Sequence, residues 1–195
     1  MSEVIDNFLD NETSNEIEKQ LLSANFPWYY CENSTTYTNE HKRLLKDKNL
    51  KIKSYLQFTH DFYIMSEKTK IMHASKNVHL ANKIIDEYIK RFGKKSVEIL
   101  RVKANFNTQT TNTDGECHDL PHIDRKDKHI VLLYYVNDTD GDTILFDNDL
   151  NIIKRVSPKK NRVLIFDGNI LHAGCSPIQS KKRVGINFNF GIRNE

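Results

Sequence analysis

The sequence has no long apolar run. No stretch approaches the roughly 18 consecutive apolar residues that a membrane-spanning helix needs. The opening segment, residues 1–9, carries Glu3 and Asp6 and lacks both a basic start and an apolar centre, so we expect neither a signal peptide nor an anchor. These absences predict a soluble protein that stays in the cytoplasm.

Cysteine is also scarce. The three cysteines, Cys31, Cys117 and Cys175, are far apart and odd in number, and the spacing Cys-x-x-Cys does not occur. This usage argues against a disulfide framework and indicates a reducing compartment.

Charge of one sign is not in excess. The formal net charge is only +3, and acidic and basic residues are mixed along the chain, so nothing marks a strong binder of nucleic acid or of a membrane surface. The lysine-rich segments 42–53 and 154–162 are interpreted as solvated faces.

The apolar content is sufficient for one folded unit. A chain of 195 residues with 38% hydrophobic and 10% aromatic residues can close a single core, and no repeat, low-complexity segment or interdomain linker interrupts it. We therefore expect a single domain over residues 1–195, in which residues 1–95 give helical and loop support to a β-rich core over residues 96–195.

Two helices are expected in the supporting half, after a first strand over residues 4–9. Thr13 and Glu16 form a capping box ahead of an apolar pattern, which predicts a helix over residues 14–24. A second helix follows from apolar residues at the 3.6 period over residues 78–92, with Gly93 at the expected C-cap.

Between these helices, residues 32–50 are polar and are expected to form a loop, and residues 55–63 are expected to form a strand. The aromatic group that follows Phe26 is interpreted as core packing, with an extended or turn conformation imposed by Pro27. His60 is interpreted as a structural histidine rather than a ligand.

From residue 97 onward the pattern changes to short apolar or alternating runs separated by turn residues. Strands are predicted near residues 97–107, 129–136, 143–147, 151–156, 162–166, 170–174 and 183–191. Seven closely spaced strands after two helices predict a mainly β protein, a double-stranded β-helix (jelly roll) with the helices packed on one sheet.

The chemistry is expected at His122 and Asp124. On an extended segment, residues two apart point to the same face, so both side chains can reach one metal ion. His172, one short turn after an apolar strand, would complete a two-His, one-carboxylate facial triad, which suits Fe(II) and leaves neighbouring coordination positions open. The pattern His-x-Asp alone occurs by chance about as often as not in a chain of this composition. It is evidence for a metal site only together with His172 and the predicted strands.

A helical zinc-protease site is a poor alternative. Pro121 disfavours the helix that would pair His118 with His122, and Asp119 stands where such a site has glutamate.

Arg183 lies 11 positions after His172, at the start of the last long strand. Its planar guanidinium suits two-point binding of a carboxylate deep in a barrel. The neighbouring Lys181 and Lys182 are interpreted as a solvated turn.

The order and spacing of these blocks resemble the iron(II) and 2-oxoglutarate dependent dioxygenases, most closely their prolyl-hydroxylase-like branch and its small phage and bacterial members. The resemblance covers about residues 98–190 and rests on His122-Ile123-Asp124, Leu132-Leu133-Tyr134-Tyr135-Val136-Asn137, Gly141-Asp142-Thr143-Ile144-Leu145-Phe146, Val156-Ser157-Pro158-Lys159, Leu164-Ile165-Phe166-Asp167-Gly168, His172 and Arg183.

The resemblance implies a hydroxylase. His122, Asp124 and His172 would bind Fe(II), Arg183 would hold the distal carboxylate of the co-substrate 2-oxoglutarate, and Tyr135 would assist it. Gly185 stands where many relatives have a serine, which removes one hydrogen bond to that carboxylate. Oxidative decarboxylation to succinate and carbon dioxide would accompany hydroxylation of a substrate C–H bond, with ascorbate as a helper, in the cytoplasm of a cell or of a phage-infected host.

The expected substrate is a peptide or protein, at proline, and residues 107–117 could form a loop that covers it. An alternative is an oxygenase of a small molecule or of a nucleic-acid base. The base is disfavoured because Asn189 stands where such demethylases carry a second arginine, and the charge is near neutral. Another alternative is a jelly-roll domain that binds metal without turnover.

Overall fold

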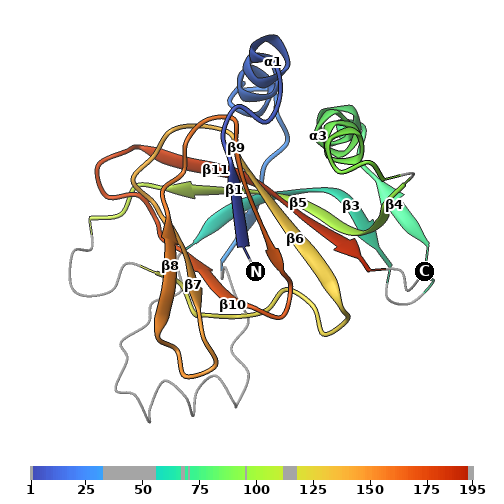
Figure 1. Cartoon of the computed structure of the whole chain (residues 1–195). Helices are drawn as coiled ribbons and strands as arrows, with labels where there is room; N and C mark the ends of the chain where they lie inside the picture. The colour runs from blue at the N-terminus through green and yellow to red at the C-terminus, as the bar shows by residue number, and fades with distance from the viewer. Residues whose placement is uncertain are drawn as a thin grey trace.

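The computed structural model describes residues 2–32, 56–66, 69, 71–94, 96–111 and 118–192. Two antiparallel β-sheets form the body of the molecule, and the helices cover one of them (Figure 1). In spatial order, the large sheet holds β1 (Ser2–Ile5), β9 (Arg162–Asp167), β6 (His129–Tyr135), β11 (Lys182–Gly191), β5 (Glu98–Thr108), β3 (Gln57–Met65) and β2 (Tyr29–Cys31), with β4 (Met72–Ala74) paired to β3. The small sheet holds β10 (Leu171–Gly174), β7 (Thr143–Phe146) and β8 (Ile152–Val156). This arrangement confirms the predicted mainly β jelly roll.

The outer face of the large sheet packs on the helices α1 (Asn11–Leu21) and α3 (Val78–Arg91), which lie side by side over it (Figure 1). Strands alternate their side chains between the two faces of a sheet. One set of strand residues therefore joins the helices in a buried apolar core: Val102, Ala104, Leu132, Tyr134, Val136, Val163, Val184, Ile186, Phe188 and Phe190. The expectation that helices pack on one sheet is confirmed.

The opposite, inner face of the large sheet meets the small sheet over only part of its width. Along β6 and β9 this face is apolar and is buried against Leu145 of β7 and Val156 of β8. Along β5 and β11 the inward residues are polar or charged, and they include Arg101, Asn187 and Arg183. The covered apolar part holds the two sheets together, whereas the polar part lines a cavity.

The first helix begins earlier than its sequence pattern predicted. Its N-cap is Asp10, whose carboxylate accepts a hydrogen bond from the backbone N–H of Thr13 at 2.8 Å, so the prediction of a cap at Thr13 was wrong. Asp10 is among the most effective N-cap residues and satisfies a donor of the first turn. The second helix agrees with its prediction, and Gly93 follows it with φ +59°, a conformation that glycine adopts without strain.

The N-terminal half supplies two short strands, β2 and β4, besides the helices and the two strands that the sequence predicted. Strands β1, β2, β3 and β4 all come from residues 2–74 and extend the large sheet at both edges. The first strand ends at Ile5 rather than Leu9, because the chain turns at Asn7, which has φ +52°. The predicted loop over residues 32–50 lies outside the described residues, apart from Glu32.

Asn161 fastens the N-terminal segment to the sheet. Its side chain accepts a hydrogen bond from the N–H of Leu9 and donates one to the carbonyl of Leu9, each at 2.8 Å. Its backbone carbonyl accepts from the N–H of Phe8, and its backbone N–H donates to Tyr135. Asn161 is buried and has φ +62°, a region that asparagine tolerates better than most residues.

Replacing Asn161 with alanine is expected to lower the free energy of unfolding by about 3 kcal/mol. The variant leaves the buried N–H and carbonyl of Leu9 without partners, at about 1–3 kcal/mol for each group, and keeps a strained φ. For a chain of this size the melting temperature should fall by roughly 6–12 °C. The exposed Asn169→Ala is the matched control, and equal melting temperatures of the two variants would contradict this role.

None of the described helices is long and apolar enough to cross a membrane.

Candidate functional site

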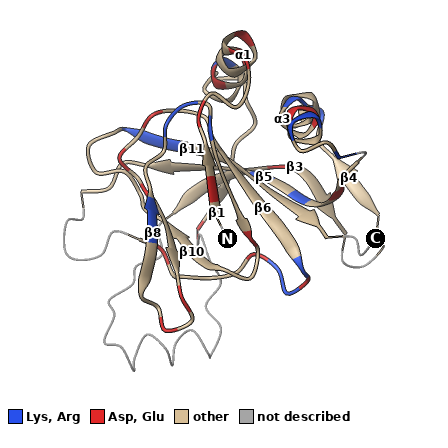
Figure 2. Ribbon diagram, in the orientation of Figure 1, with Lys and Arg blue, Asp and Glu red and all other residues tan. Residues whose placement is uncertain are grey.

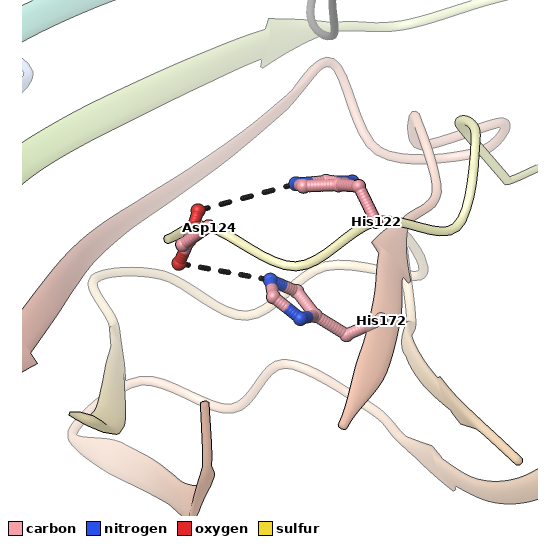
Figure 3. Close-up of side chains that lie close together, drawn as sticks. All are labelled: His122, Asp124 and His172. Carbon is pink, nitrogen blue, oxygen red and sulfur yellow. Dashed lines mark ion pairs between the residues drawn. The ribbon is translucent and has the colours of Figure 1, made fainter. Parts of the chain in front are cut away.

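His122 and His172 are brought together by backbone pairing. His172 lies on β10, and His122 forms an isolated antiparallel bridge with it, in which each backbone N–H donates to the other residue's carbonyl at 3.0 Å. Asp124 follows on the same extended segment. Two distant parts of the sequence therefore supply the three residues of one cluster (Figure 3).

Each oxygen of Asp124 faces one imidazole ring. The distance from His122 Nε2 to Asp124 Oδ1 is 4.0 Å, and the distance from His172 Nε2 to Asp124 Oδ2 is 3.8 Å. One ligand atom from each residue lies within 4.8 Å of the other two, so the three groups could hold a single metal ion. The sequence spacing predicted this grouping.

Both rings are held with Nε2 pointing into the site. His122 Nδ1 lies 2.8 Å from the carbonyl of Leu120, and His172 Nδ1 lies 3.1 Å from the carbonyl of Ile170. A carbonyl only accepts, so each Nδ1 carries the proton and each Nε2 keeps a free lone pair. This is the arrangement in which a ligand histidine donates its other ring N–H to a carbonyl.

Electrostatics favour the same protonation states. Burial, followed by the nearby His172, lowers the pKa of His122 to about 4, so its ring is neutral at neutral pH. Burial alone would raise the pKa of Asp124. The electrostatic interactions with His172, Arg101 and His122, together with the hydrogen bond from Asn189, outweigh burial and hold the pKa of Asp124 well below its usual range. A neutral imidazole and an ionised carboxylate are the forms that bind a metal ion.

Three side chains fix the carboxylate of Asp124. Arg101 Nη2 donates to Oδ1 at 2.6 Å, while Asn187 Nδ2 and Asn189 Nδ2 donate to Oδ2 at 2.8 and 2.9 Å. Arg101 lies on β5 and both asparagines lie on β11, with Asn189 directly opposite Arg101 in the sheet. The site therefore includes residues of the large sheet that the motif alone did not identify.

Arg183 is buried, with 6% of its surface exposed. Its Nε donates to the carbonyl of Gly141 at 2.7 Å, its Nη2 donates to Thr143 Oγ1 at 2.9 Å, and its Nη1 reaches Asn107 Oδ1 at 3.5 Å. All three partners are neutral, and no carboxylate in the described part of the chain lies within ion-pair distance. A buried cation without an anionic partner lowers the stability of the fold, so this guanidinium favours the binding of an acidic ligand.

Gly141 makes room for this side chain. A Cβ there would lie 2.5 Å from the carbonyl oxygen of Cys175 and 2.8 Å from Cδ of Arg183. Glycine is therefore needed at position 141 because a larger residue would collide with the side chain of Arg183.

Tyr135 is fully buried, and its hydroxyl donates to Thr143 Oγ1 at 2.8 Å. Burial raises the pKa of Tyr135 to about 12, so the phenol stays protonated. Thr143 accepts from both Tyr135 and Arg183, and its own hydroxyl proton remains available to a ligand. Thr143 lines the cavity, so the structure adds it to the predicted set.

The three residues of the cluster, Arg183 and Thr143 border one cavity of about 420 Å³, within the range of small-molecule sites. It is lined by Gln57, Arg101, Lys103, Asn105, Asn107, Asp119, His122, Ile123, Asp124, Leu133, Thr143, His172, Ala173, Gly174, Arg183 and Asn187. Arg183 and the His122–Asp124–His172 cluster thus face the same space. The predicted covering loop over residues 107–117 lies mostly outside the described residues.

His60 is not part of this cavity. It is buried on the helix side of β3, where Nδ1 lies 2.9 Å from the carbonyl of Pro27 and Nε2 lies 2.8 Å from Ser75 Oγ. Both ring nitrogens have partners, in agreement with its interpretation as a structural histidine.

The comparisons with known proteins agree with this geometry. Residues 108–191 match the sequence profile of the 2OG-Fe(II) oxygenase superfamily, and this range contains the histidine–aspartate cluster, Tyr135 and Arg183. The cofactor and co-substrate of this family are Fe(II) and 2-oxoglutarate. No curated protein sequence matches the chain.

Solved structures share the fold at low sequence identity. An oxidoreductase of the 2OG-Fe(II) oxygenase family from Burkholderia pseudomallei has a TM-score of 0.68 and 10% identity, with 99% of this chain and 86% of that chain covered. A prolyl hydroxylase from Trichoplax adhaerens, in complex with a hypoxia inducible factor peptide fragment, has a TM-score of 0.61 and 15% identity, with 97% and 83% covered.

A viral collagen prolyl hydroxylase from Paramecium Bursaria Chlorella virus-1 has a TM-score of 0.52 and 13% identity, with 98% of this chain and 96% of that chain covered. At these identities the neighbours establish the fold alone. Over residues 108–191, the chain is similar in sequence to the 2OG-Fe(II) oxygenase superfamily.

Proposed function

We propose that the protein is a 2-oxoglutarate-dependent hydroxylase in which His122, Asp124 and His172 hold Fe(II). The observation that carries this proposal is the shared cavity: a two-His, one-carboxylate cluster opens into the same space as a buried arginine that has no carboxylate partner among the described residues. The donor set fits the metal, because this facial triad is typical of non-haem Fe(II) oxygenases.

The chain's own groups divide the work. His122 and His172 present neutral Nε2 lone pairs, since their Nδ1 protons are committed to backbone carbonyls. Arg183 binds the distal carboxylate of 2-oxoglutarate, and the Thr143 hydroxyl donates a further hydrogen bond to it. The hydroxyl of Tyr135 donates to Thr143 Oγ1 and so orients the Thr143 hydroxyl. When bound, Fe(II) would activate dioxygen, which is the oxidant: one oxygen atom would enter succinate as 2-oxoglutarate loses carbon dioxide, and the other would enter the substrate C–H bond. The protein's remaining task is to place the substrate and exclude other groups.

For the substrate we propose a peptide, hydroxylated at proline. The support is the similarity to two prolyl hydroxylases, one of them in complex with a peptide fragment, over nearly the whole chain. The polar inner face of β5 and β11 offers amide groups that can pair with a peptide backbone.

The test is to incubate the protein with Fe(II), 2-oxoglutarate, ascorbate and a panel of proline-containing peptides. We expect succinate formation together with a peptide mass gain of one oxygen atom, localised to proline by fragmentation. Succinate formation without peptide modification would retain the oxygenase and reject the peptide. Absence of both, with metal shown to be bound, would reject the hydroxylase.

Replacing Asn189 with leucine is expected to weaken Fe(II) binding by about 10- to 100-fold, the usual effect of losing a group that orients a metal ligand. Leucine keeps the volume but removes the donor to Asp124 Oδ2. Anaerobic metal titration measures the affinity, and the exposed Asn169→Leu is the matched control. Unchanged affinity in Asn189→Leu would show that Arg101 and Asn187 suffice to hold the carboxylate.

A further inference from the structure

Lys103 is a cation in the cavity that the proposed chemistry does not use. It lies on β5 with its side chain on the polar inner face of the large sheet, between Arg101 and Asn105. The strand register places it opposite Asn187 of β11 and Asp61 of β3. It is half-buried, and it makes no hydrogen bond or ion pair with any described residue.

Among the described residues, no carboxylate forms an ion pair with Lys103. Arg101 is engaged with Asp124, and Asp61 is exposed and outside ion-pair distance. Burial and the charge of Arg101 lower the pKa of Lys103, and this effect exceeds the opposing influence of Asp61. A half-buried ammonium without an ion-pair partner in the described part of the chain favours an anionic ligand.

Two further polar atoms beside Lys103 lack partners. Asn105 Oδ1 and Arg101 Nε are both buried and have no hydrogen-bond partner among the residues that the structure describes. Buried polar atoms are normally paired, so unpaired ones that line a cavity indicate where a ligand contributes groups. Together these residues require an anionic acceptor for Lys103 and Arg101, and an N–H or O–H donor for Asn105.

The co-substrate does not meet this requirement. Arg183 stands opposite Asn107 in the sheet, whereas Lys103 stands opposite Asn187, four residues further along β11. At about 3.4 Å per residue, the two backbone positions are roughly 13 Å apart. Arg183 and Lys103 therefore start from different parts of the cavity wall, which leaves Lys103 for a ligand other than the carboxylate that Arg183 binds.

We propose that Lys103 binds a carboxylate of the substrate, so that the hydroxylated residue lies beside an aspartate or glutamate side chain, while a peptide N–H pairs with Asn105. This inference rests on the proposed peptide hydroxylation. A carboxylate fits better than a dianionic phosphate, because Asp61 and the acceptor oxygen of Asn105 lie on the same face. Neither Lys103 nor Arg101 lies within the range that matches the superfamily profile.

The experiment compares matched peptides that differ only in Asp against Asn, or Glu against Gln, on either side of the target residue. A charged hydrogen bond contributes about 1.5–3 kcal/mol, so we expect kcat/KM to favour the acidic peptide by about 10-fold or more. Lys103→Met should reduce this preference to within about twofold. Lys103→Arg should retain it, and Lys103→Glu should favour a peptide with lysine at that place.

Lys90→Met is the matched control, because Lys90 is a highly exposed residue on α3, on the other side of the large sheet. Calorimetric binding of the same peptide pairs to the anaerobic Fe(II)·2-oxoglutarate protein gives a readout that does not depend on turnover. Acidic preference in wild type and its loss in Lys103→Met would support the subsite.

The outcomes separate this inference from the proposed function. Peptide hydroxylation without acidic preference would overturn the subsite and leave the hydroxylase intact. Acidic preference among free amino acids or other small carboxylates, with no peptide modified, would support the subsite and overturn the peptide. Preference for phosphoserine over both aspartate and glutamate would overturn the assignment to a carboxylate.

Discussion

Replacing His172 with alanine is expected to reduce 2-oxoglutarate turnover by more than about 100-fold. Loss of a group that only orients a ligand already costs about 10- to 100-fold in affinity or activity, and loss of the ligand itself should exceed that. In His172→Ala the cluster keeps only one imidazole and one carboxylate.

The measurement is succinate formation at saturating Fe(II) and 2-oxoglutarate, together with anaerobic metal titration. The matched control is His79→Ala, because His79 is exposed on α3 (Figure 1) and lines no part of the cavity. His79→Ala should bind metal and turn over as wild type does. Wild-type metal affinity in His172→Ala would show that the cluster is not the metal site.

The grouping of His122, Asp124 and His172 could be predicted from the sequence because its geometry follows from local rules. Residues two apart on an extended segment share a face, which fixes His122 and Asp124 relative to each other. His172 was predicted from a turn that follows an apolar strand, and in the structure it pairs directly with His122. Arg183 was predicted in the same way, from its place at the start of a long strand.

The groups that support this cluster could not be predicted in the same way. Arg101 meets Asp124 only because β5 and β11 are neighbours in the sheet, and Asn189 stands opposite Arg101 only because of their register. Sequence patterns identify the faces of strands but not which strands pair or in what register. Lys103 and Thr143 likewise gain significance only from the cavity that they line.

The errors in the N-terminal half have a related cause. The strands β2 and β4 are three residues long and mostly exposed, so neither shows the alternation that marks a half-buried strand. They form because β3 offers an edge for pairing.

Figure 2 shows charges of both signs on α1 and α3. This agrees with the mixed charge pattern of the sequence, from which we did not expect a strongly basic binding face.

Replacing Arg183 with methionine is expected to abolish stabilisation by 2-oxoglutarate without unfolding the protein. In wild type, 2-oxoglutarate at 100 times its dissociation constant should add about 2.7 kcal/mol, or roughly 5–11 °C in melting temperature for a chain of this size. If the variant binds 2-oxoglutarate about 100-fold more weakly, the same concentration adds only about 0.4 kcal/mol. The shift then falls to about 2 °C or less.

The stability of Arg183→Met without co-substrate distinguishes a binding role from a structural one. The variant loses the hydrogen bonds to Gly141 and Thr143 but also removes a buried cation that has no carboxylate partner in the described ranges. These effects oppose each other, so we expect the free energy of unfolding to change by no more than roughly 1 kcal/mol. The exposed Arg155→Met is the control and should keep the full shift. If Arg183→Met melts far below wild type without 2-oxoglutarate, the arginine is chiefly structural. If the variant keeps the full increase in melting temperature with 2-oxoglutarate, another cation holds the co-substrate, and Lys103 would be the first to test.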